Sequence, residues 1–321
     1  MQIYPGSEAY SNLRHNIGKA QARIPRKWEM PFSRNNGASI FPTINPGFQM
    51  RRGDKIFTIG SCFARNIEEV LVVHGFNVPV KAFTLAGPEI ALPPNHILNE
   101  YNAGTTMQRI ESVCDLFEYT DEMGIEETDK GFLDLFLHVL TLPTSYDRLI
   151  ERRREIQTLY KEMLSSDVVI LTMGLIEAWY DNTFNCYLNK TPSNMLIRAD
   201  ESRFSFHRFE LDDVVKRMSR GIEVALEFGV KNILLTVSPV PLETTFTRDG
   251  SVLANSYSKA VLRVAADILS KKYPQVDYFP SYEIVTSFGT GGYVEDNVHV
   301  KEDVVEQVVD YMAECYINSS N

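Results

Sequence analysis

The segment KIFTIGSCFARN, Lys55–Asn66, predicts a strand, a tight turn and a helix in immediate succession. The apolar run at 56–59 is typical of a short strand, and it stops at Gly60, which allows the backbone to turn sharply. Ser61 and Cys62 then stand beside the free backbone N–H groups of a helix N-terminus. Strand–turn–helix geometry of this kind exposes a nucleophile, so we expect the chemistry of the protein at this turn.

Strand and helix patterns alternate along the rest of the chain. Strands are predicted at 76–80, 167–173, 231–237 and 276–279, and helices at 63–74, 105–117, 144–165, 211–228, 252–272 and 301–316. Such alternation favours right-handed crossovers and a parallel sheet covered on both faces. The predicted fold class is therefore α/β, a flavodoxin-like three-layer α/β/α sandwich, with insertions at 118–143 and 182–206.

The N-terminal region differs in composition from the remainder. Residues 1–50 hold five prolines and the turn signal Asn35-Asn36-Gly37, which predicts an irregular arm on the domain surface or a partly ordered leader. Residues 51–321 show no internal repeat, low-complexity tract or linker, so we expect them to form a single α/β domain.

Net charge and cysteine spacing argue against several classes of protein. A net charge of -10 and a pI near 5.2 argue against nucleic-acid partners and anionic membrane surfaces. The four cysteines are scattered without a CxxC pair, so neither a disulfide framework nor a metal site is expected. No signal peptide or membrane-spanning run is evident. We expect a cytoplasmic protein without membrane insertion, and the oligomeric state stays open.

Polar groups follow the predicted strands in a fixed order. They are Gly60-Ser61-Cys62, Asn102-x-Gly104, Gly174-x-x-Glu177 and, before the last helix, Asp296-x-x-His299. Ligands of open α/β sheets bind outside the carboxyl ends of the strands, so these groups are expected to meet at one edge.

This order of motifs resembles the SGNH (GDSL-type) hydrolases. More closely, Gly60-Ser61-Cys62-Phe63-Ala64 spells the name of the bacterial GSCFA family, and the likeness covers about residues 50–310 by motif order. It continues through Gly174-Leu175-Ile176-Glu177-Ala178-Trp179, Ser238-Pro239-Val240-Pro241-Leu242, Asn255-Ser256-Tyr257-Ser258-Lys259, Phe279-Pro280-Ser281-Tyr282-Glu283 and Glu295-Asp296-Asn297-Val298-His299. The resemblance implies an SGNH-type fold and a hydrolase-like site.

A nucleophile needs a base, and the base needs an orienting acid. His299 is the expected base, and Asp296 is expected to hold its Nδ1–H. The register of the resemblance puts Cys62 at the nucleophile position, although a slip of one residue would return Ser61 to that role. A helix N-terminus and a nearby histidine should lower the thiol pKa. The structural alternative is a small Cys62 that packs the first helix.

The remaining site residues are expected to bind the oxyanion or the substrate. Oxyanion donors are the backbone N–H groups of Cys62 and Gly104 with the Asn102 side chain. Ile176 replaces the asparagine of the hydrolase pattern, and Glu177 replaces its aspartate. Glu177 could bind substrate hydroxyls, act as an acid or make a structural hydrogen bond. Trp179 could stack on a sugar or pack in the core; the turn glycines Gly60 and Gly174 complete the set.

These residues together predict acyl-ester chemistry through a covalent acyl-enzyme. The protein would be an esterase or an O-acyltransferase that acts on a small molecule, a carbohydrate or a polysaccharide precursor. No metal and no permanently bound cofactor is expected, and an acyl-CoA is a candidate donor. The alternative is a non-catalytic glycan- or nucleotide-binding module on the same scaffold.

Overall fold

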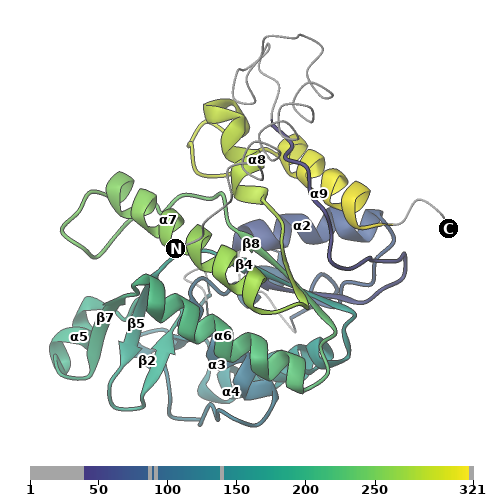
Figure 1. Ribbon diagram of the computed structural model, residues 1–321. Helices are drawn as coiled ribbons and strands as arrows, with labels where there is room; N and C mark the ends of the chain where they lie inside the picture. The colour runs from purple at the N-terminus through teal and green to yellow at the C-terminus, as the bar shows by residue number, and fades with distance from the viewer. Residues whose placement is uncertain (1–39, 86–88, 90–92, 138–140, 318–321) are drawn as a thin grey trace.

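The computed structural model describes residues 40–85, 89, 93–137 and 141–317 (Figure 1). Most of the predicted arm at 1–50 therefore lies outside the described residues, and the division at residue 51 stays a prediction. The end of the arm that is described lies against the last helix, where the Met50 N–H donates to the Tyr316 carbonyl over 2.8 Å.

A four-stranded parallel sheet lies at the centre of the molecule. Its strands are β1 (Ile56–Gly60), β4 (Val168–Met173), β8 (Asn232–Val237) and β9 (Val276–Tyr278), in the order β1-β4-β8-β9. β1 and β4 are buried along their whole length, which explains why their sequences read as continuous apolar runs rather than as alternating ones.

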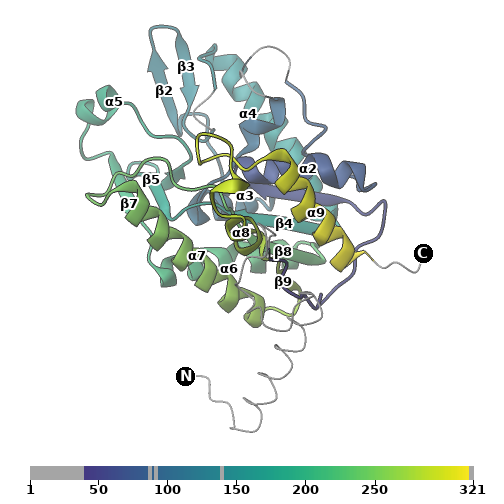
Figure 2. The same cartoon turned by 90° about the horizontal axis from the view of Figure 1, so that it is seen from above.

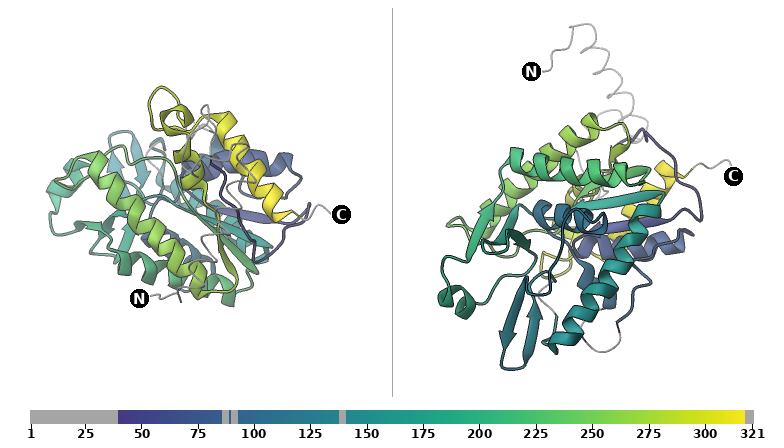
Figure 3. Two further views of the ribbon diagram at one scale, coloured as in Figure 1. Left: turned by 45° about the horizontal axis from the view of Figure 1, so that its top comes forward. Right: turned by 90° about the horizontal axis from the view of Figure 1, so that it is seen from below.

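Helices cover both faces of this sheet, as the views in Figures 2 and 3 show. One face packs α3 (Ala103–Val113), α4 (Tyr146–Lys161), α6 (Leu211–Glu227) and α7 (Ser251–Lys272). The other face packs α2 (Cys62–Val73), α8 (Ser281–Ser287) and α9 (Glu302–Tyr316). Along β4, Leu171 belongs to the first core and Ile170 to the second, as the two-residue period of a strand requires. The predicted three-layer sandwich is confirmed.

Two antiparallel additions lie beside the sandwich. They consist of the hairpin β2 (Ile125–Thr128) and β3 (Gly131–Asp134) and of a sheet in the order β6-β5-β7, made of β5 (Glu177–Asp181), β6 (Cys186–Leu188) and β7 (Phe204–Arg208) with α5 (Asn194–Ala199). A small shared core of Phe136, Leu188 and Phe204 joins them. The remaining elements are the 3₁₀ turns η1 (Pro94–Leu98), η2 (Glu162–Ser165) and η3 (Gly289–Gly292).

The prediction of a strand at 76–80 is wrong. Only Asn77 bridges to Lys55 beside the start of β1, and the Ile56 N–H donates to the Asn77 carbonyl over 2.8 Å. Phe76 and Val78 are buried, which accounts for the apolar pattern. Pro79 lacks the N–H that a longer ladder would need, so the pairing stops after one residue.

Gly60 is required where β1 meets β4. A Cβ added to Gly60 would lie 2.5 Å from the Thr172 Cβ and 2.8 Å from the Thr172 carbonyl oxygen. We therefore expect Gly60→Ala to destabilise the protein by about 1–3 kcal/mol, the usual cost of overpacking, in urea denaturation. Gly291→Ala is the matched control, because a Cβ there meets nothing within 4 Å. Equal stability of the two variants would contradict this packing argument.

In the part of the chain that the structure describes, no helix has both the length and the apolar content needed to cross a bilayer.

Candidate active site

The carboxyl ends of three strands bring the first predicted residues together. Gly60 of β1 pairs in register with Thr172 of β4, and Met173 of β4 pairs with Val237 of β8. The residues that follow these pairs, including Cys62, therefore leave the sheet at one edge. This edge is where an open parallel sheet binds ligands.

Ser61 makes a structural hydrogen bond between two segments at this edge. It is the N-cap residue of α2, its side chain is buried, and its Oγ donates to the Ser238 Oγ over 3.2 Å. The Ser238 Oγ also accepts the Val240 N–H over 3.3 Å. The Ser61 hydroxyl thus connects the end of β1 to the loop after β8.

Cys62 is the first residue of α2 and is half-buried. The backbone N–H groups of Phe63 and of Cys62 itself favour the thiolate form of this side chain. Burial nevertheless raises the pKa of the thiol, and these N–H groups with the charges of Lys259 and Arg65 only partly offset that effect. The expectation of a lowered thiol pKa is therefore wrong, because desolvation outweighs the helix N-terminus.

Lys259 of α7 ends the motif Asn255-Ser256-Tyr257-Ser258-Lys259, but no role in the site was predicted for it from the sequence. Its side chain is buried, and its Nζ donates to the Gly174 carbonyl oxygen over 2.7 Å. Among the described residues it forms no ion pair with a carboxylate, and burial lowers its pKa to about 7. One signal was available: Lys259 shares the helical face of Leu262 and Ala266, which is otherwise apolar and buried.

Asp296 and His299 form the predicted pair at the surface. The His299 Nδ1 lies 2.6 Å from the Asp296 Oδ2, and the Asp296 Oδ1 accepts the Val298 and His299 N–H groups over 2.8 and 2.9 Å. These bonds, led by the one from His299, lower the pKa of Asp296 to about 2. The imidazole is 65% exposed.

The loop that carries this pair reaches the same edge of the sheet. The Tyr293 hydroxyl donates to the Pro239 carbonyl over 3.1 Å, one residue after Ser238. No hydrogen bond joins His299 to Cys62 or to Ser61 within the described ranges. Proton transfer between His299 and the nucleophile therefore stays a prediction.

Asn102 and Gly104 begin α3 beside this edge. The Asn102 Oδ1 accepts the Thr105 N–H over 2.9 Å as the N-cap of α3, and Asn102 also bridges to Leu175. This bond orients the side-chain amide of Asn102, and the amide nitrogen is the group that can donate to a substrate. A Cβ at Gly104 would lie 2.5 Å from the Tyr187 ring, so this glycine permits close packing. Their oxyanion role stays a prediction.

Glu177 and Trp179 lie on β5, further from the strand ends of the central sheet. Glu177 is buried and accepts the Thr245 hydroxyl over 2.7 Å, which matches the structural alternative for this residue. The Trp179 ring meets the rings of Phe206 and Phe246 edge-on, at centroid distances of 5.7 and 5.2 Å. Binding of a substrate by either residue stays a prediction.

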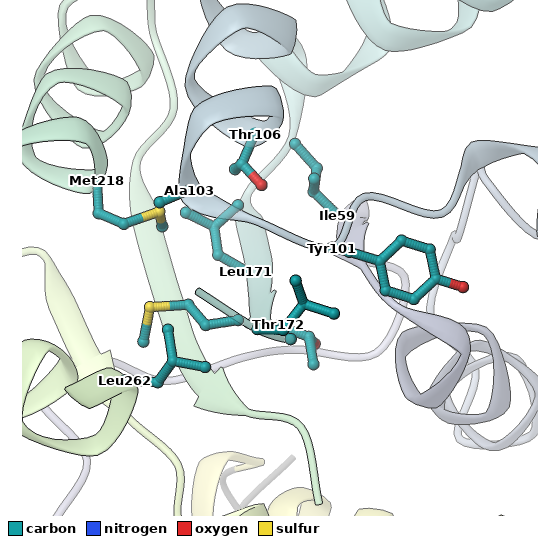
Figure 4. A pocket seen from close by; sticks show the side chains of 11 residues that line it. Ile59, Tyr101, Ala103, Thr106, Leu171, Thr172, Met218 and Leu262 are labelled. Carbon is teal, nitrogen blue, oxygen red and sulfur yellow. The ribbon is translucent and has the colours of Figure 1, made fainter. Parts of the chain in front are cut away.

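A small cavity lies beneath the strand ends, with a volume of about 10 Å³. Met218 of α6 and Leu262 of α7 reach into it, with Thr172 at its strand side (Figure 4). It has room for about one water. A larger hollow of about 420 Å³ lies between α3 and α4, and its lining contains none of the predicted site residues. Cys62 lines neither of these two hollows.

Within the described residues, no group of three histidine, cysteine or acidic side chains could hold a metal ion. No curated protein matches the chain. The model of the GSCFA family matches residues 55–312, a range that includes Cys62, Lys259 and His299. This match covers most of the chain, and the protein therefore belongs to the GSCFA family.

Proposed function

We propose that the protein catalyses acyl-ester chemistry through a covalent acyl-enzyme on Cys62, as an esterase or an O-acyltransferase. One observation carries this proposal. A half-buried thiol stands at the first position of α2, at the carboxyl edge of the sheet, where the N-terminal N–H groups of the helix are free to donate. This placement suits a nucleophile whose tetrahedral intermediate has its oxyanion stabilised by helix N-terminal donors.

Cys62 is a better nucleophile here than Ser61. The Ser61 hydroxyl is buried and donates its proton to Ser238, which is itself fixed by the Val240 N–H. Attack by Ser61 would break this connection between two loops. Cys62 has no such structural hydrogen bond to another side chain among the described residues, so its sulfur can attack a carbonyl carbon on the open side of the edge.

The other predicted residues take complementary roles in this scheme. The cap bond from the Thr105 N–H to the Asn102 Oδ1 orients the side-chain amide, and its NH₂ group donates to the oxyanion. His299 is exposed and is oriented by Asp296 through its Nδ1. Its Nε2 can therefore take the proton of the acceptor, which is water in an esterase and a sugar hydroxyl in a transferase.

Resemblance supports the class of chemistry and of substrate. The order of the motifs from Gly60-Ser61-Cys62 to Asp296-x-x-His299 resembles that of SGNH hydrolases. By that likeness the acceptor is a carbohydrate or a polysaccharide precursor, and an acyl-CoA is the candidate donor. The open edge beside an exposed imidazole is compatible with a bulky acceptor.

A non-catalytic glycan- or nucleotide-binding module is the second candidate function. Two observations favour it: burial raises the thiol pKa of Cys62, and Ile176, which replaces the asparagine donor, is buried. A binding module would keep the scaffold and form no covalent adduct.

Intact-protein mass spectrometry separates these two functions. The protein is incubated with p-nitrophenyl acetate or acetyl-CoA, and we expect one acetyl adduct that is absent from Cys62→Ala and retained in Ser61→Ala. Cys315→Ala is the matched control, because Cys315 is also a half-buried cysteine that forms no disulfide. An adduct lost only in Ser61→Ala would assign the serine as the nucleophile. Absence of any adduct in the wild-type protein would favour the binding module.

A further inference from the structure

We propose that Lys259 is the catalytic base that takes the proton from the Cys62 thiol, so that the nucleophile is activated by a cysteine–lysine pair rather than by His299. This inference rests on the acyl-enzyme function proposed above. It assigns a role to a residue of α7 that lies 197 positions after Cys62 in the sequence.

The geometry of the strand ends places the two groups together. Gly60 and Thr172 are paired in register, and Cys62 and Gly174 each follow two residues later. Adjacent parallel strands are about 4.8 Å apart, so these residues leave the sheet as neighbours. Lys259 donates to the Gly174 carbonyl over 2.7 Å, which fixes its amine beside the turn that carries Cys62.

Few charged groups other than Cys62 and Lys259 themselves act on these two side chains. Cys62 is the titratable group whose charge acts on Lys259, and no carboxylate of the described residues bonds to that amine. Arg65 acts on Cys62 as a second positive charge. Burial and the charge of Cys62 both raise the pKa of Tyr101, so the Tyr101 hydroxyl stays protonated. A buried lysine is usually paired with a carboxylate, and among the described residues Lys259 has no such partner.

Proton transfer between the two groups is assigned to water. No direct hydrogen bond joins the Lys259 Nζ to the Cys62 sulfur in the described part of the protein, so we assign the transfer to one bridging water. The cavity of about 10 Å³ beneath the strand ends has room for one water, and it is lined by Gly174 and by Thr172, whose buried Oγ1 has no hydrogen-bond partner among the described residues.

The reaction balances with these groups and His299. The neutral Lys259 amine accepts the thiol proton, and the Cys62 thiolate attacks the carbonyl carbon of the acyl donor. The tetrahedral intermediate collapses with cleavage of the bond to the leaving oxygen or sulfur, and the Lys259 ammonium returns the proton to that atom. In the second half, water or a sugar hydroxyl attacks the thioester while His299 takes its proton. The C–S bond then breaks, and the released Cys62 thiolate receives that proton from His299.

The pH dependence of single-turnover acylation by p-nitrophenyl acetate tests this role. Burial lowers the pKa of Lys259 to about 7, so the wild-type rate should rise through an inflection near that pH. Lys259→Met should lower the rate by about 10²-fold or more and remove the inflection, as expected for the loss of a general base. Lys259→Arg keeps the charge but cannot release a proton near neutrality, so it should be equally slow. Lys272→Met, which removes an exposed lysine of the same helix, should match the wild type.

Alkylation of Cys62 by iodoacetamide, followed by peptide mass spectrometry, reports on the pair without any acyl donor. At pH 6, where Lys259 is mostly protonated, we expect Lys259→Met to slow alkylation about tenfold, equivalent to about one pKa unit of lost thiolate stabilisation. If acylation fails in the wild type but this effect is present, the proposed function falls while the pairing stands. Unchanged acylation and alkylation in a folded Lys259→Met or Lys259→Arg protein, with both lost in His299→Ala, would overturn the proposal.

Discussion

Arg65→Met is expected to destabilise the protein by about 3–5 kcal/mol, because it leaves a buried carboxylate without its partner. The Arg65 Nη1 lies 3.0 Å from the Glu68 Oε1, and the two side chains are 1% and 0% exposed. Glu68 also accepts from Asn95 over 2.8 Å and from the Thr58 hydroxyl. This network connects β1, η1 and the first turn of α2, so its loss should also loosen the helix that presents Cys62.

Urea denaturation of two further variants makes the test specific. The double variant Arg65→Met with Glu68→Gln removes both charges, and we expect it to recover part of the loss because no unpaired charge remains. Lys271→Met breaks an exposed pair with Asp267 and should cost less than about 0.5 kcal/mol. A cost for Arg65→Met as small as that for Lys271→Met would contradict the buried-network account.

Thermal stability is expected to rise as the pH increases from about 7 to 9, and Lys259 is the cause. The pKa of Lys259 falls from 10.5 to about 7 on folding. Between these values the unfolded chain binds more protons than the folded protein, so higher pH favours folding. A difference of one proton corresponds to at most about 1.4 kcal/mol per pH unit. Cys62 acts in the opposite direction, but only above its ordinary pKa of 9.0, because its folded value is raised.

Differential scanning calorimetry of the wild type and Lys259→Met checks this prediction. The variant has no amine to desolvate, so its stability should be almost flat from pH 7 to 9 and should exceed that of the wild type most at the acidic end. Lys272→Met should keep the wild-type slope, because the exposed ammonium of Lys272 stays charged throughout this range. A wild-type slope that survives in Lys259→Met would show that another group titrates.

The sequence predicted the central sheet because its strands carry an unambiguous signal. The runs at 167–173 and 231–237 are continuous and β-branched, and they became β4 and β8. The segment at 76–80 had a similar apolar content, yet pairing failed because Pro79 cannot donate. The antiparallel strand β5 was not foreseen, since Glu177–Asp181 pairs with β7 through contacts that no local pattern reveals.

In the candidate site too, the features fixed by local sequence were predictable and those that depend on tertiary packing were not. The bond between Asp296 and His299 was predictable, because a spacing of three residues in one turn fixes both groups locally. The raised thiol pKa of Cys62 was not, because it depends on how much protein surrounds the sulfur. The role of Lys259 was not predicted, because Gly174, which accepts its hydrogen bond, and Cys62, whose charge acts on it, are both distant from it in sequence.

Localisation of the acyl group tests the central claim most directly. After a brief reaction with p-nitrophenyl acetate, the adduct is mapped by tandem mass spectrometry, and half of the sample is treated first with neutral hydroxylamine, which cleaves thioesters much faster than oxygen esters. We predict acetyl on Cys62, removed by hydroxylamine and absent from Cys62→Ala. A hydroxylamine-resistant acetyl on Ser61, or a wild-type protein that carries no acetyl group at this turn, would contradict the proposal of a thiol acyl-enzyme.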